Sequence, residues 1–197
     1  MPVREGWTID REERFGEGLT PPWMDRSGMR YVDTGIRPVD PRVSGMLEDL
    51  SNRTVEEDLR EPSYFSLAVR SIDGFYCTKK GALPTQLSDQ DLVDVVDFDP
   101  VRGWMLTGGG ERPDDSSAFL WFAHKAFFHD NMFLLVSLEN RTLPDPISYR
   151  GAASAGSMLD TVSEWKGSNH LIKWGFLLWR GSDPLLMEKG LITYLRP

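Results

Sequence analysis

The segment from Arg112 to Lys125 constrains the fold more than any other part of the chain. It begins with Arg-Pro-Asp-Asp-Ser-Ser and continues with Ala-Phe-Leu-Trp-Phe-Ala-His-Lys. The polar start is typical of a helix N-terminus, and the carboxylate of Asp115 can accept hydrogen bonds from free backbone N–H groups. The aromatic residues cover more than one narrow stripe of such a helix: Phe119, Trp121, Phe122, Phe127 and Phe128. We therefore expect a helix near 115 that is buried on two sides of a layered domain.

Hydrophobic periodicity predicts the other elements. Helices are expected over 41–51 and 152–165, with a short last one starting at Asp183-Pro184. Strands are expected over 65–70, 74–78, 92–98, 102–106, 132–138, 171–174 and 176–179. Asp73-Gly74 and Asp99-Pro100 indicate hairpin turns, whereas Gly175 fits either a hairpin or a bulge. The order of elements predicts an α/β (α+β) domain around an antiparallel sheet.

The chain divides by composition at about residue 40. Residues 1–40 are rich in Pro, Gly and charge, and their aromatic residues follow no helical or strand period. We expect an irregular N-terminal arm over 1–40, which wraps its own domain or a neighbouring subunit, and one domain over 41–197. With 197 residues and seven Trp, the chain can close one substantial core but hardly two.

Charge and cysteine content exclude several classes of partner. The net charge is −8, which disfavours nucleic acid or an anionic membrane as the main partner, since both select for clustered Lys and Arg. The sequence has no apolar run of about 18 residues and no basic-then-apolar N-terminus, so we expect a soluble, cytoplasmic protein. The single cysteine, Cys77, lies in an aromatic-rich strand and is expected to be a small buried hydrophobe.

Two motifs give a family resemblance over roughly Val43 to Met187. Residues 73–81 read Asp-Gly-Phe-Tyr-Cys-Thr-Lys-Lys-Gly, and residues 87–95 read Leu-Ser-Asp-Gln-Asp-Leu-Val-Asp-Val. They are similar to the Asp-Gly-Phe-x-Ile-Thr-Pro-Ser-Gly and Leu-Thr-Pro-Glu-Asp-Leu-Val-x-Val-Asp segments of the class II aldolase/adducin family. The resemblance implies a three-layer αβα domain around a mainly antiparallel central sheet. Related proteins form ring-like oligomers, so it also implies a homo-oligomer.

The resemblance ends at the residues that carry the family's chemistry. Where the family has Lys-Pro-Ser-Ser-Glu, this chain has Arg112-Pro113-Asp114-Asp115-Ser116, so Ser116 stands at the acid/base position. The family's three zinc-binding histidines correspond to Val136, Leu138 and Trp174. None of these side chains ligates zinc, so we expect no cofactor, although the family implies zinc.

The three histidines offer one alternative metal site. His124 and His129 are five residues apart and would point about 140° away from each other on one helix. A site formed by His124, His129 and His170 is therefore weighed against three isolated histidines, and the isolated arrangement is favoured.

A small anionic sugar is the ligand that the resemblance suggests. The family's phosphate-binding loops correspond here to Phe65-Ser66, Lys80-Gly81 and Asp114-Asp115. The candidate ligand-binding residues are Lys80, Gly81, Arg112 and Ser116, and Lys79 adds a further cation. Two carboxylates at the phosphate position would repel a dianion. The alternative without a ligand is a solvated Lys79-Lys80 turn and an ordinary helix cap at Asp114-Asp115.

Two functional classes follow. The first is a non-catalytic binding or assembly protein on the aldolase/adducin fold. The second is a carbon–carbon lyase or epimerase acting on a sugar phosphate with a different, metal-independent site. That site would use the candidate catalytic residues Asp114, Asp115 and Ser116, together with Lys80 and His170, in a subunit cleft. The first class is favoured, and a tight metal or a perturbed acid/base pair among these residues would argue against it.

Overall fold

A computed structural model describes residues 29–35, 38–109, 111–138 and 152–196 of the chain. The helices are α2 (Pro41–Glu56), α3 (Ser117–Ala126), α4 (Ala152–Trp165) and α5 (Pro184–Leu195), with short 3₁₀ turns at Pro84–Gln86 and Asp89–Asp91. The strands are β1 (Arg30–Asp33), β2 (Phe65–Arg70), β3 (Phe75–Thr78), β4 (Leu92–Asp99), β5 (Trp104–Gly108), β6 (Met132–Ser137), β7 (His170–Lys173) and β8 (Phe176–Gly181).

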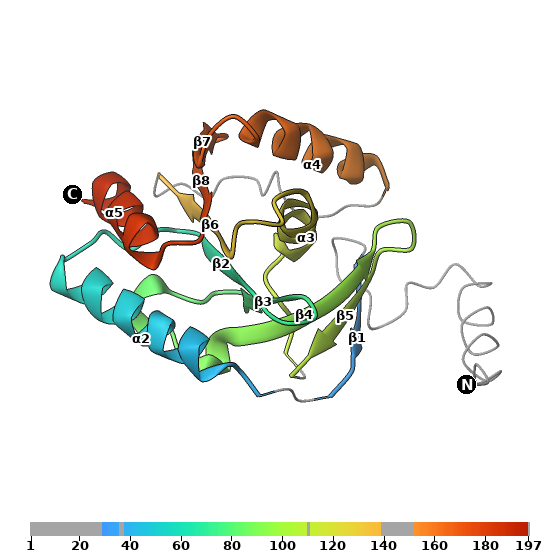
Figure 1. Cartoon of the computed structure of the whole chain (residues 1–197), viewed down its shortest axis with the longest axis horizontal. Helices are drawn as coiled ribbons and strands as arrows, with labels where there is room; N and C mark the ends of the chain where they lie inside the picture. The colour runs from blue at the N-terminus through green and yellow to red at the C-terminus, as the bar shows by residue number, and fades with distance from the viewer. Residues whose placement is uncertain (1–28, 36–37, 110, 139–151, 197) are drawn as a thin grey trace.

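The strands form one sheet in the order β1-β5-β4-β3-β2-β6-β8-β7. Every pair is antiparallel except β1 with β5, which is parallel. Helices α2 and α5 cover one face of the sheet, and α3 and α4 cover the other (Figure 1). This arrangement confirms the predicted three-layer α/β domain around a mainly antiparallel sheet.

Strand alternation divides the buried side chains between two cores. In β6, Phe133 and Leu135 pack with α3 and α4, whereas Met132, Leu134 and Val136 pack with α2 and α5. On the α3 side, Phe119 stacks on Trp165 of α4 with ring centroids 6.1 Å apart. Helix α3 therefore lies against both the sheet and α4, as its aromatic surface predicts.

Two glycines fix the hairpin turns. A Cβ on Gly74 would lie 2.1 Å from the carbonyl oxygen of Val95, so the turn between β2 and β3 requires glycine. Trp174 and Gly175 join β7 to β8 with φ of +56° and +81°. Two consecutive residues with positive φ are typical of a type I′ hairpin turn. Of the two possibilities at Gly175, a hairpin or a bulge, the structure therefore has a hairpin.

Several predicted boundaries are wrong. Helix α2 extends five residues past the predicted end at 51, and α5 has 12 residues, where the sequence indicated a short helix. Helix α3 ends at Ala126, so Phe128 lies beyond it and is 68% exposed. Strand β1 lies within the predicted irregular arm because Arg30–Asp33 pairs with β5. Residues 1–28 of that arm lie outside the described residues, and the boundary at residue 40 stays a prediction.

The start of α3 also differs from the prediction. Its first residue is Ser117, and Asp114, not Asp115, accepts a hydrogen bond from a backbone N–H, that of Ser116 at 2.9 Å. The carboxylate of Asp115 instead pairs with the ammonium group of Lys80. The predicted carboxylate cap is therefore wrong: Ser116 is the N-cap residue and makes no side-chain cap hydrogen bond, and Asp114 bonds the N–H of Ser116 just before the helix.

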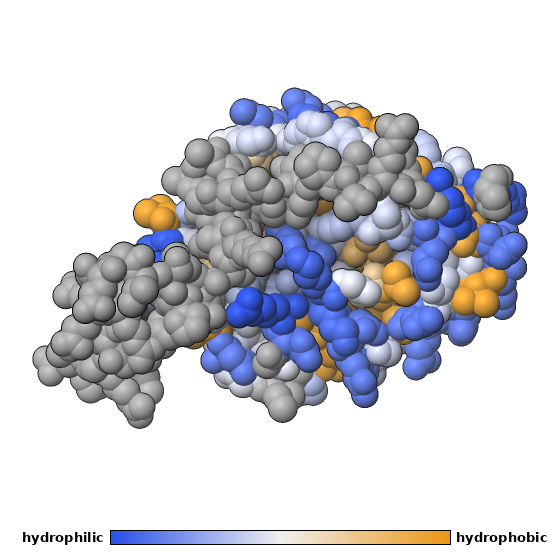
Figure 2. All heavy atoms as spheres, turned by 180° about the vertical axis from the view of Figure 1, so that it is seen from behind, coloured by the Kyte–Doolittle hydropathy of each residue, from blue (hydrophilic) through white to orange (hydrophobic). Residues whose placement is uncertain are grey.

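Cys77 is fully buried in β3, as expected for a small hydrophobe. Burial raises the pKa of its thiol, and the nearby carboxylate of Asp114 adds to that rise. Among the described residues, no helix is long and apolar enough to cross a bilayer. Figure 2 shows hydrophobic side chains in separate spots among hydrophilic ones on the face seen from behind.

Candidate functional site

The candidate site lies where β3 ends and α3 begins. Lys79 forms a β-bridge with Pro113, and the backbone N–H of Asp114 donates to the carbonyl oxygen of Thr78 at 2.9 Å. These contacts fasten the Pro-Asp-Asp-Ser segment to the end of the sheet. As a result, the side chains of Asp114 and Ser116 point into the layer between the sheet and α3 and are 2% and 0% exposed.

Asp114 is the centre of a buried hydrogen-bond network. Its Oδ1 accepts from the backbone N–H of Ser116 at 2.9 Å and from the Ser116 hydroxyl at 2.8 Å. The phenol of Tyr64, from the segment before β2, donates to the same oxygen. Three donors on one carboxylate oxygen hold the start of α3 against the start of β2.

The environment of Asp114 changes its protonation. Burial raises the pKa of this carboxyl to about 6, against the opposing effect of the hydrogen bonds from Tyr64 and Ser116. The charge of Asp115 contributes to the same rise. A carboxyl group that titrates near neutral pH is a feature of many catalytic acids and bases, and also of buried structural carboxyls.

Hydroxyl groups continue the network into the sheet. Ser116 Oγ lies 3.1 Å from Ser66 Oγ, which in turn lies 3.5 Å from Thr78 Oγ1. The backbone N–H of Leu67 donates to Thr78 Oγ1 at 3.1 Å. All three hydroxyl residues are fully buried. The polar atoms are therefore bonded to one another within the protein interior, whereas a ligand site would present them to a cleft.

The predicted ligand-binding residues make different contacts within the chain. Lys80 is exposed, and its ammonium lies 2.5 Å from the Asp115 carboxylate. The Arg112 guanidinium lies over the ring of Tyr31, 5.5 Å from its centroid. Gly81 occupies a turn with φ of +81°. Of the predicted set, only Ser116 belongs to the buried network with Asp114.

The positions predicted for the zinc ligands also lie apart from Ser116. Val136 and Leu138 pack with the α2 and α5 core, on the opposite face from Ser116. Trp174 lies in the turn after β7 and is 40% exposed. On the face of β6 that Ser116 shares, the residues are Leu135 and Ser137, and Ser137 Oγ accepts from the backbone N–H of Tyr64 at 3.0 Å. Neither Val136 and Leu138 nor their neighbours Leu135 and Ser137 carry a nitrogen or sulfur ligand. These residues therefore do not fit zinc.

The histidines lie in three different environments. His124 is buried in α3, with Nε2 3.3 Å from Nη1 of Arg70. Burial, together with the charges of Arg70 and Lys125, lowers the pKa of His124 to about 4. The ring of His129 contacts Phe128, and His170 lies exposed on the edge strand β7, near Tyr194. No group of three potential metal-ligating side chains occurs among the described residues.

Sequence reasoning did not assign Tyr64, Thr78 or Ser137 to the site, and it placed Ser66 only in a loop that corresponds to a phosphate-binding loop of the family. Ser66 and Ser137 interrupt runs of apolar residues in β2 and β6, and strand alternation places both on the α3 face. A polar residue on the inner face of a buried strand needs a hydrogen-bond partner, and that need was the available signal. Tyr64 gave no such signal because it precedes its strand.

Comparisons with known proteins agree with the fold. No protein-family model matches the sequence, and no curated protein matches it significantly. Among solved structures, the chain is similar to L-fuculose-1-phosphate aldolase from Thermus thermophilus, with 16% identity over 79% of this chain and 90% of that one, at a TM-score of 0.53. It is also similar to YgbL from Klebsiella pneumoniae, named as a putative aldolase/epimerase/decarboxylase, with 14% identity over 77% and 87% of the two chains, at a TM-score of 0.51.

These similarities show that the chain has a class II aldolase-like fold. The fold implied by the sequence motifs at 73–81 and 87–95 is thereby confirmed. At such low identity the similarity concerns the fold alone, so any function has to follow from the site.

Proposed function

We propose that this chain is a non-catalytic binding or assembly protein built on a class II aldolase-like fold. The network around Asp114 supports the proposal most directly. Ser116 stands where the resemblance places the catalytic acid/base, and its hydroxyl is buried and bonded to Asp114 and Ser66. A hydroxyl held in this way stabilises the start of α3 and is not presented to a substrate.

The residues at the metal positions support the same proposal. A metal in such an enzyme polarises substrate oxygens and stabilises the negative charge that develops on them. Val136, Leu138 and Trp174 cannot ligate zinc. If the family positions fall one residue earlier in β6, they are occupied by Leu135 and Ser137. These side chains therefore do not fit the metal-dependent chemistry of such an enzyme. The cytoplasmic location expected from the sequence belongs to this proposal and can be tested by cell fractionation.

A turnover assay tests the proposal. The chain is incubated with L-fuculose 1-phosphate, the compound that names its Thermus structural neighbour, with and without added Zn²⁺, and cleavage is followed by NMR. The Thermus aldolase in the same buffer is the positive control. We expect no cleavage above background. Cleavage by the wild-type chain that is lost in Asp114→Asn would overturn the proposal.

One observation favours a second function, an enzyme with an altered site acting on a sugar phosphate. Asp114 has a pKa of about 6 and accepts a hydrogen bond from Tyr64, so its carboxyl group can take up or release a proton near neutral pH. Lys80 and Arg112, near the surface of the same segment, would then attract the anionic sugar, with Gly81 and Ser116 beside them. This enzyme should show a pH–rate profile with a pKa near 6 that is lost in Asp114→Asn and moves upward in Tyr64→Phe, because the Tyr64 hydrogen bond lowers that pKa.

A further inference from the structure

The last strand of the sheet, β7, leaves one side of its backbone open. It pairs with β8, and within the described part of the chain no strand lies beyond it (Figure 1). Hydrogen-bonded pairs alternate along an antiparallel ladder, and the carbonyl oxygen of Asn169 accepts from the backbone N–H of Arg180 at 2.8 Å. Every second residue from Asn169 therefore faces β8, and the backbone groups of His170 and Ile172 point away from the sheet. The N–H of His170 donates to Ser168 Oγ at 3.2 Å, which leaves both backbone groups of Ile172 and the carbonyl oxygen of His170 at the open edge.

The side chains of β7 do not protect this edge. Ile172 lies opposite Leu177 on the α5 face of the sheet and is 51% exposed. Edge strands are usually protected by charged side chains, by proline or by a covering segment. The one Lys in β7, Lys173, pairs with Glu164 of α4 at 2.7 Å and is thereby held on the α4 face. The edge thus combines open backbone groups with an exposed apolar side chain.

Trp174, next to this edge, has an unfavourable backbone conformation. Its φ is +56°, at a turn position where Asn, Asp or Gly is favoured, and its side chain is 40% exposed. The ammonium group of Lys173 lies 4.5 Å from the centroid of the Trp174 ring. The turn itself gives no reason for a tryptophan here, whereas tryptophan is enriched among the residues that dominate binding energy at interfaces. The tip of the β7–β8 hairpin therefore has the character of a contact surface.

The charge around β7 differs from that of the whole chain. Residues 165–181 contain Lys166, Lys173 and Arg180 but no Asp or Glu, although the chain carries a net charge of −8. Lys173 and Arg180 are paired with carboxylates of neighbouring elements. Lys166 is exposed and forms no ion pair within the part of the chain that the structure describes. The surface beside β7 therefore has a surplus positive charge, which complements an acidic partner.

We propose that the open edge of β7 binds an extended acidic segment of a partner protein, which adds to the sheet as a further strand. Only an extended backbone supplies donors and acceptors at the spacing of a strand edge. Apolar side chains of the added segment would contact Ile172 and Trp174, and its carboxylates would face Lys166. Strands β6 and β8 separate β7 from β2 and the Asp114 network. Peptide binding is therefore independent of sugar-phosphate turnover, and failure of this proposal leaves the proposed function untouched.

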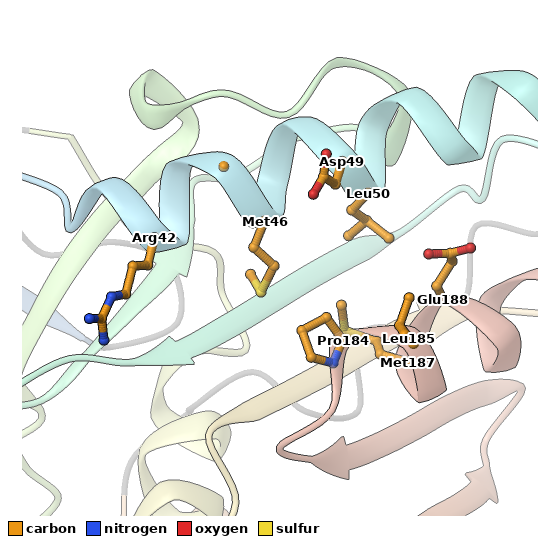
Figure 3. A pocket seen from close by; sticks show the side chains of 9 residues that line it. Arg42, Met46, Asp49, Leu50, Pro184, Leu185, Met187 and Glu188 are labelled. Carbon is orange, nitrogen blue, oxygen red and sulfur yellow. The ribbon is translucent and has the colours of Figure 1, made fainter.

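The groove between α2 and α5 provides a comparison surface (Figure 3). It has a volume of about 430 Å³, and Leu185 at its lip is 61% exposed. Its lining residues belong to helices, which use their backbone groups internally, and its carboxylate Glu188 lies 4.0 Å from the guanidinium of Arg53. This groove offers no open strand edge to an extended peptide, so Leu185 is a matched control for Ile172.

Panning of a random-peptide phage library against the wild-type chain supplies the probes. We expect the enriched peptides to be rich in Asp and Glu, with apolar residues at alternate positions. Ile172→Pro removes the outward N–H and leaves the ladder to β8 intact, because proline is tolerated on the open side of an edge strand. By fluorescence polarisation, the enriched peptides should bind Ile172→Pro at least about tenfold more weakly than the wild type, and Leu185→Thr with unchanged affinity. Circular dichroism confirms that both variants are folded.

Hydrogen exchange of the wild type tests the same edge without a substitution. A saturating enriched peptide should slow exchange of the Ile172 N–H by at least about tenfold. Failure to enrich peptides, equal binding by both variants or an unchanged Ile172 exchange rate would overturn the proposal. Protection of the Ile172 N–H that rises with protein concentration in the absence of peptide would assign the edge to a second copy and overturn it as well.

Trp174→Asn separates binding from stability. Asparagine is favoured at this turn position, so the variant should unfold at the same temperature as the wild type or above it. The enriched peptides should nevertheless bind it at least about threefold more weakly, because the exposed ring is lost. A variant that unfolds at a lower temperature and binds the peptides with wild-type affinity would show that Trp174 serves the turn and not a partner.

Discussion

The two ends of α3 are closed by charged side chains of opposite sign. At the N-terminal end, the carboxylate of Asp114 accepts from the backbone and hydroxyl of Ser116. At the C-terminal end, the guanidinium of Arg70 donates to the carbonyl oxygens of His124 and Phe127 at 3.1 and 3.2 Å. Both charges complement the helix dipole. The end that carries the predicted catalytic residues is thus held in the same way as the opposite end.

The two ends differ in how strongly they depend on burial. Asp114 is 2% exposed and shares one oxygen among three donors, whereas Arg70 is half-buried and spreads its donors over several acceptors. When a fully buried carboxylate is removed, its donors are left without an acceptor, because water does not reach them to take its place. The N-terminal end should therefore be the more sensitive to mutation and to pH.

The largest effect is expected from removing the acceptor at Asp114. Asp114→Ala leaves the Ser116 backbone N–H and hydroxyl and the Tyr64 phenol without their acceptor, and should lower the free energy of unfolding by about 3 kcal/mol. Asp114→Asn keeps an acceptor oxygen and should cost much less at pH 7. Urea unfolding measures both, with Asp115→Asn as a surface control within about 0.5 kcal/mol. Equal losses for the Ala and Asn variants would show that these hydrogen bonds do not hold α3.

The next effect is a dependence of stability on pH. The pKa of Asp114 is raised from 3.8 to about 6 in the folded state, so the folded state binds more protons than the unfolded state between these values. Stability from this group is therefore greatest below pH 4 and falls as the pH rises to 6, by about 2 to 3 kcal/mol. Asp114→Asn should remove that fall. A wild-type curve and an Asn curve that remain parallel from pH 4 to 7 would refute it.

At the opposite end of α3, stability should depend on pH with the opposite sign. The pKa of His124 is lowered from 6.5 to about 4 in the folded state, so its contribution is present above pH 6.5 and is lost as the pH falls toward 4. Between about pH 4 and 6, the contributions of Asp114 and His124 to the stability of the wild type change in opposite directions. His124→Gln should therefore steepen the loss of stability with rising pH, while Asp114→Asn should reverse it. Measuring urea unfolding of both variants from pH 4 to 7 separates the contributions that the wild-type curve combines.

A smaller loss is expected from Arg70→Ala. This substitution removes charge-assisted hydrogen bonds to the carbonyl oxygens of His124, Phe127 and Asp130, and should lower the free energy of unfolding by about 2 kcal/mol. Arg102→Ala is the control, because the Arg102 side chain is 68% exposed and pairs with Asp99 beside it. A loss for Arg70→Ala no larger than that of the control would show that the C-terminal end of α3 does not depend on the guanidinium.

The elements of the fold were predictable because each has a local cause. Asp40 and Asp183 cap α2 and α5, each followed by Pro at the first helical position, and Gly74 has room only for a hydrogen beside Val95. The parallel pairing of β1 with β5 had no such cause. It depends on contacts between residues more than 70 positions apart, which no local pattern contains.

The site was less predictable than the fold for a similar reason. The Asp114-Asp115-Ser116 segment was identified correctly as a helix start, but the roles of the two carboxylates depend on which one faces the sheet. The backbone places Asp114 inside and Asp115 outside, a difference of one residue that sequence spacing does not resolve. The same one-residue difference places Val136, not Ser137, on the face of β6 away from α3.

The central claim is that Asp114 itself satisfies the start of α3, so this end of the sheet does not bind a sugar phosphate. The most direct test is thermal unfolding of the wild-type chain with L-fuculose 1-phosphate and Zn²⁺, compared with the same sugar phosphate plus a chelator. A ligand at a hundred times its dissociation constant adds about 2.7 kcal/mol, which raises the unfolding temperature of a chain of this size by several degrees. We expect no change in that temperature. A rise of several degrees that disappears in Lys80→Ala would contradict the claim.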